Sequence, residues 1–164
     1  MRTLLPWRRL AMYLIDTNIH AAYLLQDYED DRLTGNYLAM YEKVVLADRV
    51  VPDFVLGEFE TFMLQVVPSR YRLGKEDKQK LKLLVTDYMG RLIRECTLVV
   101  PDVSIVQRAW DIYFKNIDTH YLSFVDCLIL GVAEKWRYGL LTRDERMKLV
   151  ARNLGIGLLE TLGV

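Results

Sequence analysis

Four acidic residues lie where the surrounding sequence predicts either the end of a strand or the apolar part of a helix. Asp16 directly follows the apolar run YLI, and Asp144 comes two residues after the run GLLT. Glu58 lies within FVLGEFETFML, and Asp126 lies within LSFVDCLILGVAEKW. An ionised carboxylate in apolar surroundings is very costly unless it is paired or binds a metal ion. A metal site is therefore one explanation for these four positions.

Each carboxylate also has an ordinary structural explanation. Asp16 and Asp144 can be acids at helix N-termini, where the helix dipole stabilises each by roughly 0.3–1 kcal/mol. Glu58 can lie at the exposed edge of an amphipathic helix, and Asp126 can pair with an arginine or a lysine elsewhere. However, no matching cluster of basic residues occurs in the apolar contexts. Four unpaired carboxylates at one rim would repel one another, and Mg²⁺ or Mn²⁺, which favour oxygen ligands, would relieve that repulsion.

Short β-type runs alternate with longer helical patterns along the chain. Their apolar residues are mostly continuous, which is typical of parallel strands covered on both faces. The runs are MYLI, DRVV, CTLVV, GLLT and GIGLLE, at 12–15, 48–51, 96–100, 139–142 and 155–160. Strand and helix in repetition predict one α/β domain over residues 12–164, with a central, mainly parallel twisted sheet of about five strands flanked by helices. Ligands bind beyond the carboxyl ends of the strands in such sheets.

Capping residues mark the ends of the expected helices. Asp53 and Asp102 are suitable N-caps, Thr142 with Glu145 matches a capping box, and Gly155 is a suitable C-cap. Besides a helix after the first strand, we expect helices at 34–46, 53–65, 75–95, 102–114, 123–137 and 142–155.

The composition is that of an ordinary folded chain. Of 164 residues, 52% are hydrophobic and 27% are charged, and the formal net charge is zero. Zero net charge argues against binding of nucleic acid by bulk charge. Two segments are nevertheless basic, 70–82 and 135–152, each with 6 bases against 2 acids. Solvated helix faces are the simpler explanation of each segment alone.

The N-terminus and the hydropathy favour a protein without a membrane segment. No run of 18 uncharged apolar residues predicts a membrane span. Pro6, Arg8 and Arg9 interrupt the apolar run that a signal peptide would need. Residues 1–11 are either a basic N-terminal extension or precede the true start at Met12. We therefore expect a cytoplasmic protein.

Other types of site have weaker support. His20 and His120 are not at zinc-ligand spacing, and Cys96 and Cys127 match no metal motif, which favours buried free thiols in a reducing compartment. The chain lacks a dinucleotide-binding fingerprint, a Walker loop and a nucleophile elbow. A phosphoryl-accepting receiver domain would need an acidic neighbour beside Asp16 and a lysine at the end of a late strand, and both are absent.

Three segments together resemble the PIN-domain ribonucleases and, more narrowly, the VapC-type toxins of prokaryotic toxin–antitoxin pairs. They are YLIDTN, VVPDFVLGEFE and LSFVDCLILGVAEKWRYGLLTRDERM, at 13–18, 50–60 and 122–147. The motif DTN alone is weak, whereas the ordered set is fairly specific, with Asp126 and Asp144 separated by 18 residues. The resemblance spans 12–159, nearly the whole chain, and implies a PIN-like three-layer fold.

The resemblance also implies an activity and its residues. Members of the family hydrolyse phosphodiester bonds in single-stranded or loop RNA with Mg²⁺ or Mn²⁺, leaving a 5′-phosphate and a 3′-hydroxyl. Asp16, Asp126 and Asp144 would bind the metal directly, and Glu58 would be an outer or second-metal ligand. The family's supporting hydroxyl and amide fall on Thr17 or Asn18 and on Thr142.

Partners follow from the same resemblance. Family members are usually homodimers and bind a small antitoxin that occludes the site. Arg143, Arg146 and Lys148 adjoin the last acid and could contact RNA phosphates, so activity would fall with salt. Two departures exist: Cys127 replaces a residue that is often small in relatives, and the basic segment 68–95 is long, which leaves partner and substrate open. Two alternatives also stand: a PIN nuclease of RNA processing that is not a toxin, and a non-catalytic PIN-like interaction module, against which the complete set of acids argues.

Overall fold

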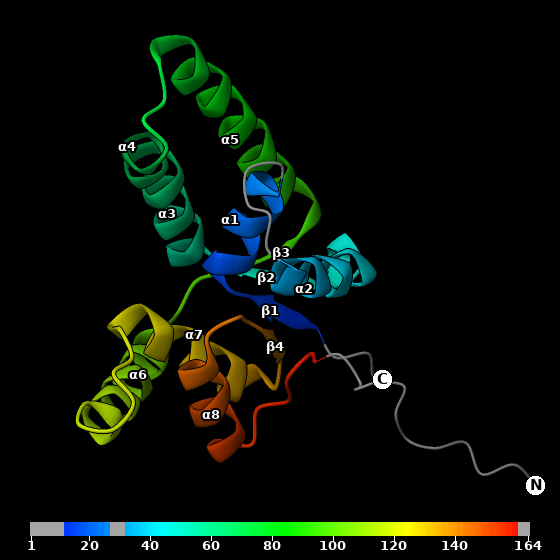
Figure 1. Cartoon of the computed structure of the whole chain (residues 1–164). Coiled ribbons are helices and arrows are strands. Elements are labelled where there is room, and N and C mark those ends of the chain that lie inside the picture. Colours follow the sequence, from blue (N-terminus) through cyan, green and yellow to red (C-terminus); the bar gives the residue numbers. More distant parts are fainter. Residues whose placement is uncertain (1–11, 27–31, 161–164) are drawn as a thin grey trace, which may run out of the picture.

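The computed structural model describes residues 12–26 and 32–160, so the extension expected at 1–11 lies outside the described residues. Four parallel strands form one sheet in the order β3-β2-β1-β4 (Figure 1). The strands are β1 (Tyr13–Ile15), β2 (Arg49–Pro52), β3 (Thr97–Val99) and β4 (Gly139–Leu141). The predicted parallel α/β fold is confirmed. In the fifth run, GIGLLE, only Leu158 pairs with the sheet, through an isolated parallel bridge to Leu140. The expected fifth strand is therefore reduced to this single bridge.

Helices cover both faces of this sheet, as the predicted three-layer fold requires. Figure 1 shows α1, α3, α4 and α5 on one side and α6, α7 and α8 on the other. The helices are α1 (Thr17–Leu25), α2 (Arg32–Lys43), α3 (Asp53–Thr61), α4 (Val67–Arg70), α5 (Lys75–Glu95), α6 (Val103–Asn116), α7 (Phe124–Trp136) and α8 (Glu145–Asn153), with a 3₁₀ turn η1 (Leu46–Asp48) and a π-helix η2 (Phe62–Val66).

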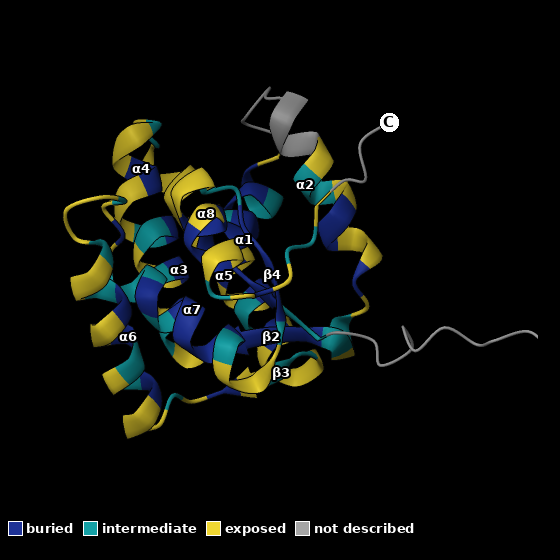
Figure 2. Cartoon of the chain, turned by 90° about the horizontal axis from the view of Figure 1, so that it is seen from below, coloured by how far each residue is buried: buried dark blue, intermediate teal, exposed yellow. Residues whose placement is uncertain are grey.

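The core is built from the strands and from the inner faces of the helices. In Figure 2 the buried residues follow the strands and α7, and exposed residues lie on the outer faces of the helices. Leu14, Val50, Val51 and Leu140 are completely buried in the sheet. β1, β2 and β4 are mostly buried and largely apolar, as strands covered on both faces are, whereas Leu98 of β3 is exposed at the edge of the sheet. Among the described residues, no helix has both the length and the apolar character that a membrane span needs.

Two of the expected helix caps are confirmed and two are wrong. Asp102 accepts a hydrogen bond from the Ile105 N–H at 3.1 Å, as an N-cap does. Gly155 follows α8 with a left-handed backbone (φ +72°), a conformation that glycine adopts without strain. The N-cap of α3 is Pro52 rather than Asp53. The N-cap of α8 is Asp144 rather than Thr142.

The helix expected at 53–65 has a different form in the structure. It is α-helical only to Thr61, continues as the π-helix Phe62–Val66, and resumes as α4. Pro68 in the first turn of α4 has no N–H to donate, and its ring would clash with the carbonyl of Leu64 in a regular helix. The widened turn avoids that clash. π-Helical turns are often found at functional sites.

A buried polar network anchors α1 to α2 and α5. His20 is completely buried, and its Nδ1 lies 2.9 Å from the Tyr88 hydroxyl, which in turn lies 2.5 Å from the Tyr41 hydroxyl. Burial lowers the pKa of His20 to about 3, so this imidazole is neutral at physiological pH. His20 is thus a structural residue. Of the two thiols, Cys127 is buried as expected, whereas Cys96 is partly exposed, and both are free.

Candidate active site

Asp16 lies at the carboxyl edge of the sheet, between the ends of two strands. Its N–H donates to the carbonyl of Leu141 at the end of β4, at 3.0 Å. Its backbone occupies the N-cap position of α1, but its side chain does not cap that helix. Instead, Oδ2 accepts hydrogen bonds from Asn18 Nδ2 at 2.7 Å and from Thr142 Oγ1 at 2.6 Å. These hydrogen bonds hold the Asp16 carboxylate toward Thr142, at the end of β4.

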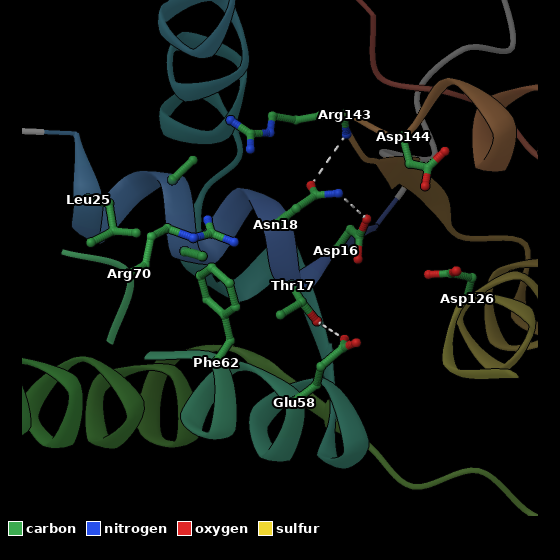
Figure 3. Close-up of a pocket in the computed structure, with 12 residues that line it drawn as sticks. Asp16, Thr17, Asn18, Leu25, Glu58, Phe62, Arg70, Asp126, Arg143 and Asp144 are labelled. Carbon is green, nitrogen blue, oxygen red and sulfur yellow. Dashed lines mark hydrogen bonds between the residues drawn. The ribbon is translucent and has the colours of Figure 1, made fainter. Parts of the chain in front are cut away.

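Asp126 is less buried than its apolar sequence context predicts. It lies in the first turn of α7 and forms a capping box with Ser123, whose N–H donates to Asp126 Oδ2 at 2.8 Å. The expectation of a deeply buried carboxylate is wrong here, because the first turn of a helix remains open on its N-terminal side. The side chain is half-buried and faces the edge where Asp16 lies (Figure 3).

Asp144 combines capping with a place at the site. Its Oδ1 accepts from the N–H groups of Arg146 at 2.8 Å and Met147 at 3.1 Å. The N–H of Asp144 in turn donates to Thr142 Oγ1 at 3.1 Å. Thr142 therefore holds both Asp16 and Asp144, as its predicted supporting position requires.

Glu58 reaches the site from α3. Thr17 Oγ1 donates a short hydrogen bond to Glu58 Oε2. Asn18 contacts two residues that follow β4. Its Nδ2 is 3.5 Å from Thr142 Oγ1, and its Oδ1 accepts a hydrogen bond from the Arg143 N–H at 3.4 Å. Thr17 thus contacts Glu58, whereas Asn18 contacts Asp16, so the two predicted supporting residues lie beside different carboxylates.

All four carboxylates line one cavity of about 240 Å³ (Figure 3). Thr17 and Thr142 hydroxyls donate to Glu58 Oε2 and Asp16 Oδ2, and backbone N–H groups donate to Asp126 Oδ2 and Asp144 Oδ1. Each carboxylate thus combines structural hydrogen bonds with a place on the wall of the cavity.

Electrostatics at the cavity disfavour the charged carboxylates. Asp16 is only 4% exposed, and its pKa is raised to about 7, chiefly by burial and further by the charges of Asp126 and Glu58. The hydrogen bond from Thr142 opposes this shift. Burial, and then the charge of Asp144, also raise the pKa of Asp126. A cation in the cavity would relieve both effects.

The four carboxylates are suitable ligands for a hard divalent cation, although their side chains do not converge on one point in the structure. Within residues 12–26 and 32–160, no three histidine, cysteine or acidic side chains lie close enough together to hold a metal ion. Carboxylate oxygens are, however, the ligand type that Mg²⁺ and Mn²⁺ prefer. Rotation of the half-buried side chains toward Asp16 would be needed to bring them together.

The three basic residues expected to contact RNA have different positions. Arg143 lines the cavity, and Arg146 is exposed outside it. Lys148 is only 6% exposed, and its ammonium group donates to Glu145 at 2.6 Å and to Tyr37. A lysine so occupied is poorly placed to contact phosphate, so we omit Lys148 from the proposal below.

The cavity also contains residues that the sequence did not single out. Ala21, Ala22 and Leu25 line it from α1, and Phe62 and Arg70 line it from η2 and α4. The spacing of the α1 residues from Asp16 on one helix face could have indicated them. Arg70 begins the basic segment at 70–82, whereas no sequence signal indicated Phe62.

Comparison with known proteins identifies the fold. The family model of the PIN domain matches residues 13–153, which is most of the chain. The chain belongs to the PIN domain family. The match to this PIN domain includes all four carboxylates and the threonine and asparagine side chains that hold them. No curated protein sequence matches the chain significantly.

Solved structures of low sequence identity share the fold of this PIN domain. FitAcB from Neisseria gonorrhoeae is 15% identical, with a TM-score of 0.67 over 93% of this chain and 100% of the other. VapC20 from Mycobacterium tuberculosis, a sarcin–ricin loop cleaving toxin, is 19% identical, with a TM-score of 0.58 over 84% and 94%. A toxin–antitoxin complex from Klebsiella pneumoniae is 16% identical, with a TM-score of 0.54 over 93% and 99%.

Proposed function

We propose that this PIN domain is a metal-dependent endoribonuclease that hydrolyses phosphodiester bonds in single-stranded or loop RNA. One observation carries the proposal: four carboxylates from separate parts of the chain line one cavity at the carboxyl edge of the sheet. Such a set suits Mg²⁺ or Mn²⁺. A bound ion would supply an activated water and neutralise charge on the scissile phosphate.

The chain's own residues would fix the direction of the four carboxylates. Thr142 and Asn18 both donate to Oδ2 of Asp16, which limits rotation of that carboxylate. Thr17 does the same for Glu58, and the Ser123 N–H does so for Asp126. Residues that orient metal ligands in this way typically contribute 10–100-fold to metal affinity or activity.

The substrate must be reached by a site that is itself acidic. Arg143 lines the cavity and Arg146 lies on the exposed start of α8, so both are placed to meet phosphates beside the carboxylates. The net charge of zero means that local cations rather than bulk charge would attract RNA. Single-stranded or loop RNA is the form whose bases a protein can reach.

Purified protein should cleave single-stranded RNA when Mn²⁺ or Mg²⁺ is present, and EDTA should stop the reaction because the carboxylates alone cannot activate water. The measurement is gel analysis of an end-labelled RNA, with mapping of the new ends. We expect 5′-phosphate and 3′-hydroxyl ends. Cleavage that continues in EDTA, or that leaves a cyclic phosphate, would show that the reaction does not depend on this site.

We further propose that the nuclease is the toxin of a toxin–antitoxin pair. The resemblance of the motifs to VapC-type toxins and the fold shared with VapC20 and the Klebsiella pneumoniae complex support this proposal. A cytoplasmic homodimer of the domain at 12–164, inhibited by a small antitoxin protein, would then be the assembly. The alternative is a PIN nuclease that processes cellular RNA.

Growth on induced expression separates these two alternatives. A toxin should arrest growth, and co-expression of a small protein encoded beside it should restore growth, because the antitoxin occludes the site. Normal growth during strong expression of an active nuclease would reject the toxin and retain the nuclease.

A further inference from the structure

The cavity at the four carboxylates continues along α1, away from them. Ala21, Ala22 and Leu25 line this part from α1, and Phe62 and Arg70 line it from η2 and α4. Figure 3 shows Leu25, Phe62 and Arg70 there. The three α1 residues follow Asp16 by five to nine positions, which is roughly 7–14 Å along a helix axis. We call this part, defined by these five residues, the Arg70 end of the cavity.

Arg70 has no anionic partner there. Its guanidinium carbon lies 5.4 Å from the centroid of the Phe62 ring, which is its interaction in the structure. Among the described residues, its side chain makes no ion pair, although four carboxylates line the same cavity. In Figure 3 the guanidinium extends over Phe62 toward Thr17 and Asn18. A planar guanidinium held in this way is suited to bind a phosphate through two parallel hydrogen bonds.

The walls of the Arg70 end are apolar and include one aromatic face. Phe62 is half-buried, and Ala21, Ala22 and Leu25 are buried opposite it. Stacking of a base on an aromatic ring is the usual way in which proteins hold single-stranded nucleic acid. The whole cavity, at about 240 Å³, is smaller than the ~300–1,000 Å³ typical of small-molecule sites. It therefore suits part of a polymer better than a complete small ligand.

We infer that the Arg70 end is a subsite for a nucleotide that flanks the scissile phosphate of single-stranded RNA. The base packs against Phe62, and the Arg70 guanidinium binds the phosphate of that nucleotide. Because the α1 residues that line the Arg70 end begin roughly 7 Å along the helix from Asp16, we place this nucleotide beside the scissile phosphate rather than at it. The inference rests on the proposed ribonuclease function and adds substrate positioning to it.

The Arg70→Ala variant should bind RNA more weakly without losing the chemical step. In Mn²⁺ we expect KM for a single-stranded RNA to rise roughly tenfold, as for the loss of hydrogen bonds between charged groups, while kcat changes little. In EDTA, fluorescence anisotropy of the same RNA over a range of KCl concentrations should show a salt slope lower by about 0.7, the value for one lost phosphate contact on a single strand.

Two further variants separate the roles. Phe62→Leu keeps the apolar volume but removes the ring face, so the affinity should fall roughly fivefold with an unchanged salt slope. Arg94→Ala removes the same charge from an exposed position on α5 outside the cavity, and it should behave like the parent. Equal KM and salt slope in the Arg70→Ala and Arg94→Ala variants would overturn the subsite, even if the parent cleaves RNA.

The remaining outcomes are also decisive. A parent that binds RNA through Arg70 but cleaves none would retain the subsite and reject the proposed nuclease. Loss of kcat alone in the Arg70→Ala variant would overturn the subsite, because Arg70 would then act at the reaction itself. Arg70-dependent binding of a fluorescent polyglutamate peptide, tighter than that of RNA, would overturn it too, since the Arg70 end would then recognise protein carboxylates.

Discussion

The Asp16→Asn variant is expected to cleave RNA at least about a hundredfold more slowly than the parent, because residues that only orient metal ligands already contribute 10–100-fold. Asp16 lies between the ends of β1 and β4 and lines the cavity. Asparagine keeps the oxygen that accepts from Asn18 and Thr142, but it replaces the charged ligand atom with an amide. The variant should therefore fold like the parent but bind the metal ion much more weakly.

Initial rates of RNA cleavage in Mn²⁺, together with circular dichroism, measure this effect. Asp87→Asn is the matched control, since Asp87 is exposed on α5 and outside the cavity, and it should retain the parent's rate. If the folded Asp16→Asn variant cleaved RNA as fast as the control, Asp16 would not be a metal ligand.

The second large effect is on stability and depends on pH. In the absence of metal, the free energy of unfolding of Asp16→Asn minus that of the parent should increase by about 4 kcal/mol between pH 4 and pH 8. The folded-state pKa of Asp16 is raised from 3.8 to about 7. Its contribution to stability is thus fully present below pH 4 and is lost as the pH rises through 7. Asparagine carries no such dependence.

The difference between the two proteins is more informative than either stability curve alone. Burial lowers the folded-state pKa of His20 from 6.5 to about 3, so this residue costs stability as the pH falls from 6.5 toward 3. The two buried groups therefore act in opposite directions between about pH 4 and 6.5, so the parent's own curve combines their effects. His20 is present in both proteins, so the subtraction removes its effect.

Urea denaturation at several pH values measures this difference. Addition of Mg²⁺ at pH 8 should stabilise the parent, by about 2.7 kcal/mol at a concentration of 100 Kd, and should stabilise Asp16→Asn much less. A constant difference across the pH range would show that Asp16 is not destabilised by its charge in the folded protein.

The sequence predicted the strands and the edge of the sheet where the acids meet, because these depend on local patterns. Continuous apolar runs such as YLI and GLL can only be buried strands or helix segments, and the acids after them then share one edge. The long helix expected at 75–95 has the same bounds in the structure. Here the local pattern and the packing agree.

The sequence could not predict features that depend on contacts between distant residues. Thr142 looked like the start of a capping box, but its hydroxyl instead donates to Asp16, a residue from another strand end. The widened turn at Phe62–Val66 depends on how Pro68 fits the helix, and it decides that Phe62 and Arg70 face α1. Lys148 was basic and near Asp144, yet packing of α8 buries it.

Anomalous scattering from a crystal of the protein soaked in Mn²⁺ would locate the ion without any assumption about activity. We expect a strong peak within ligand distance of Asp16, with Asp126 and Asp144 turned toward it and Glu58 nearby or at a second peak. Ordered carboxylates without a peak among them, at a Mn²⁺ concentration that supports RNA cleavage in solution, would contradict this expectation.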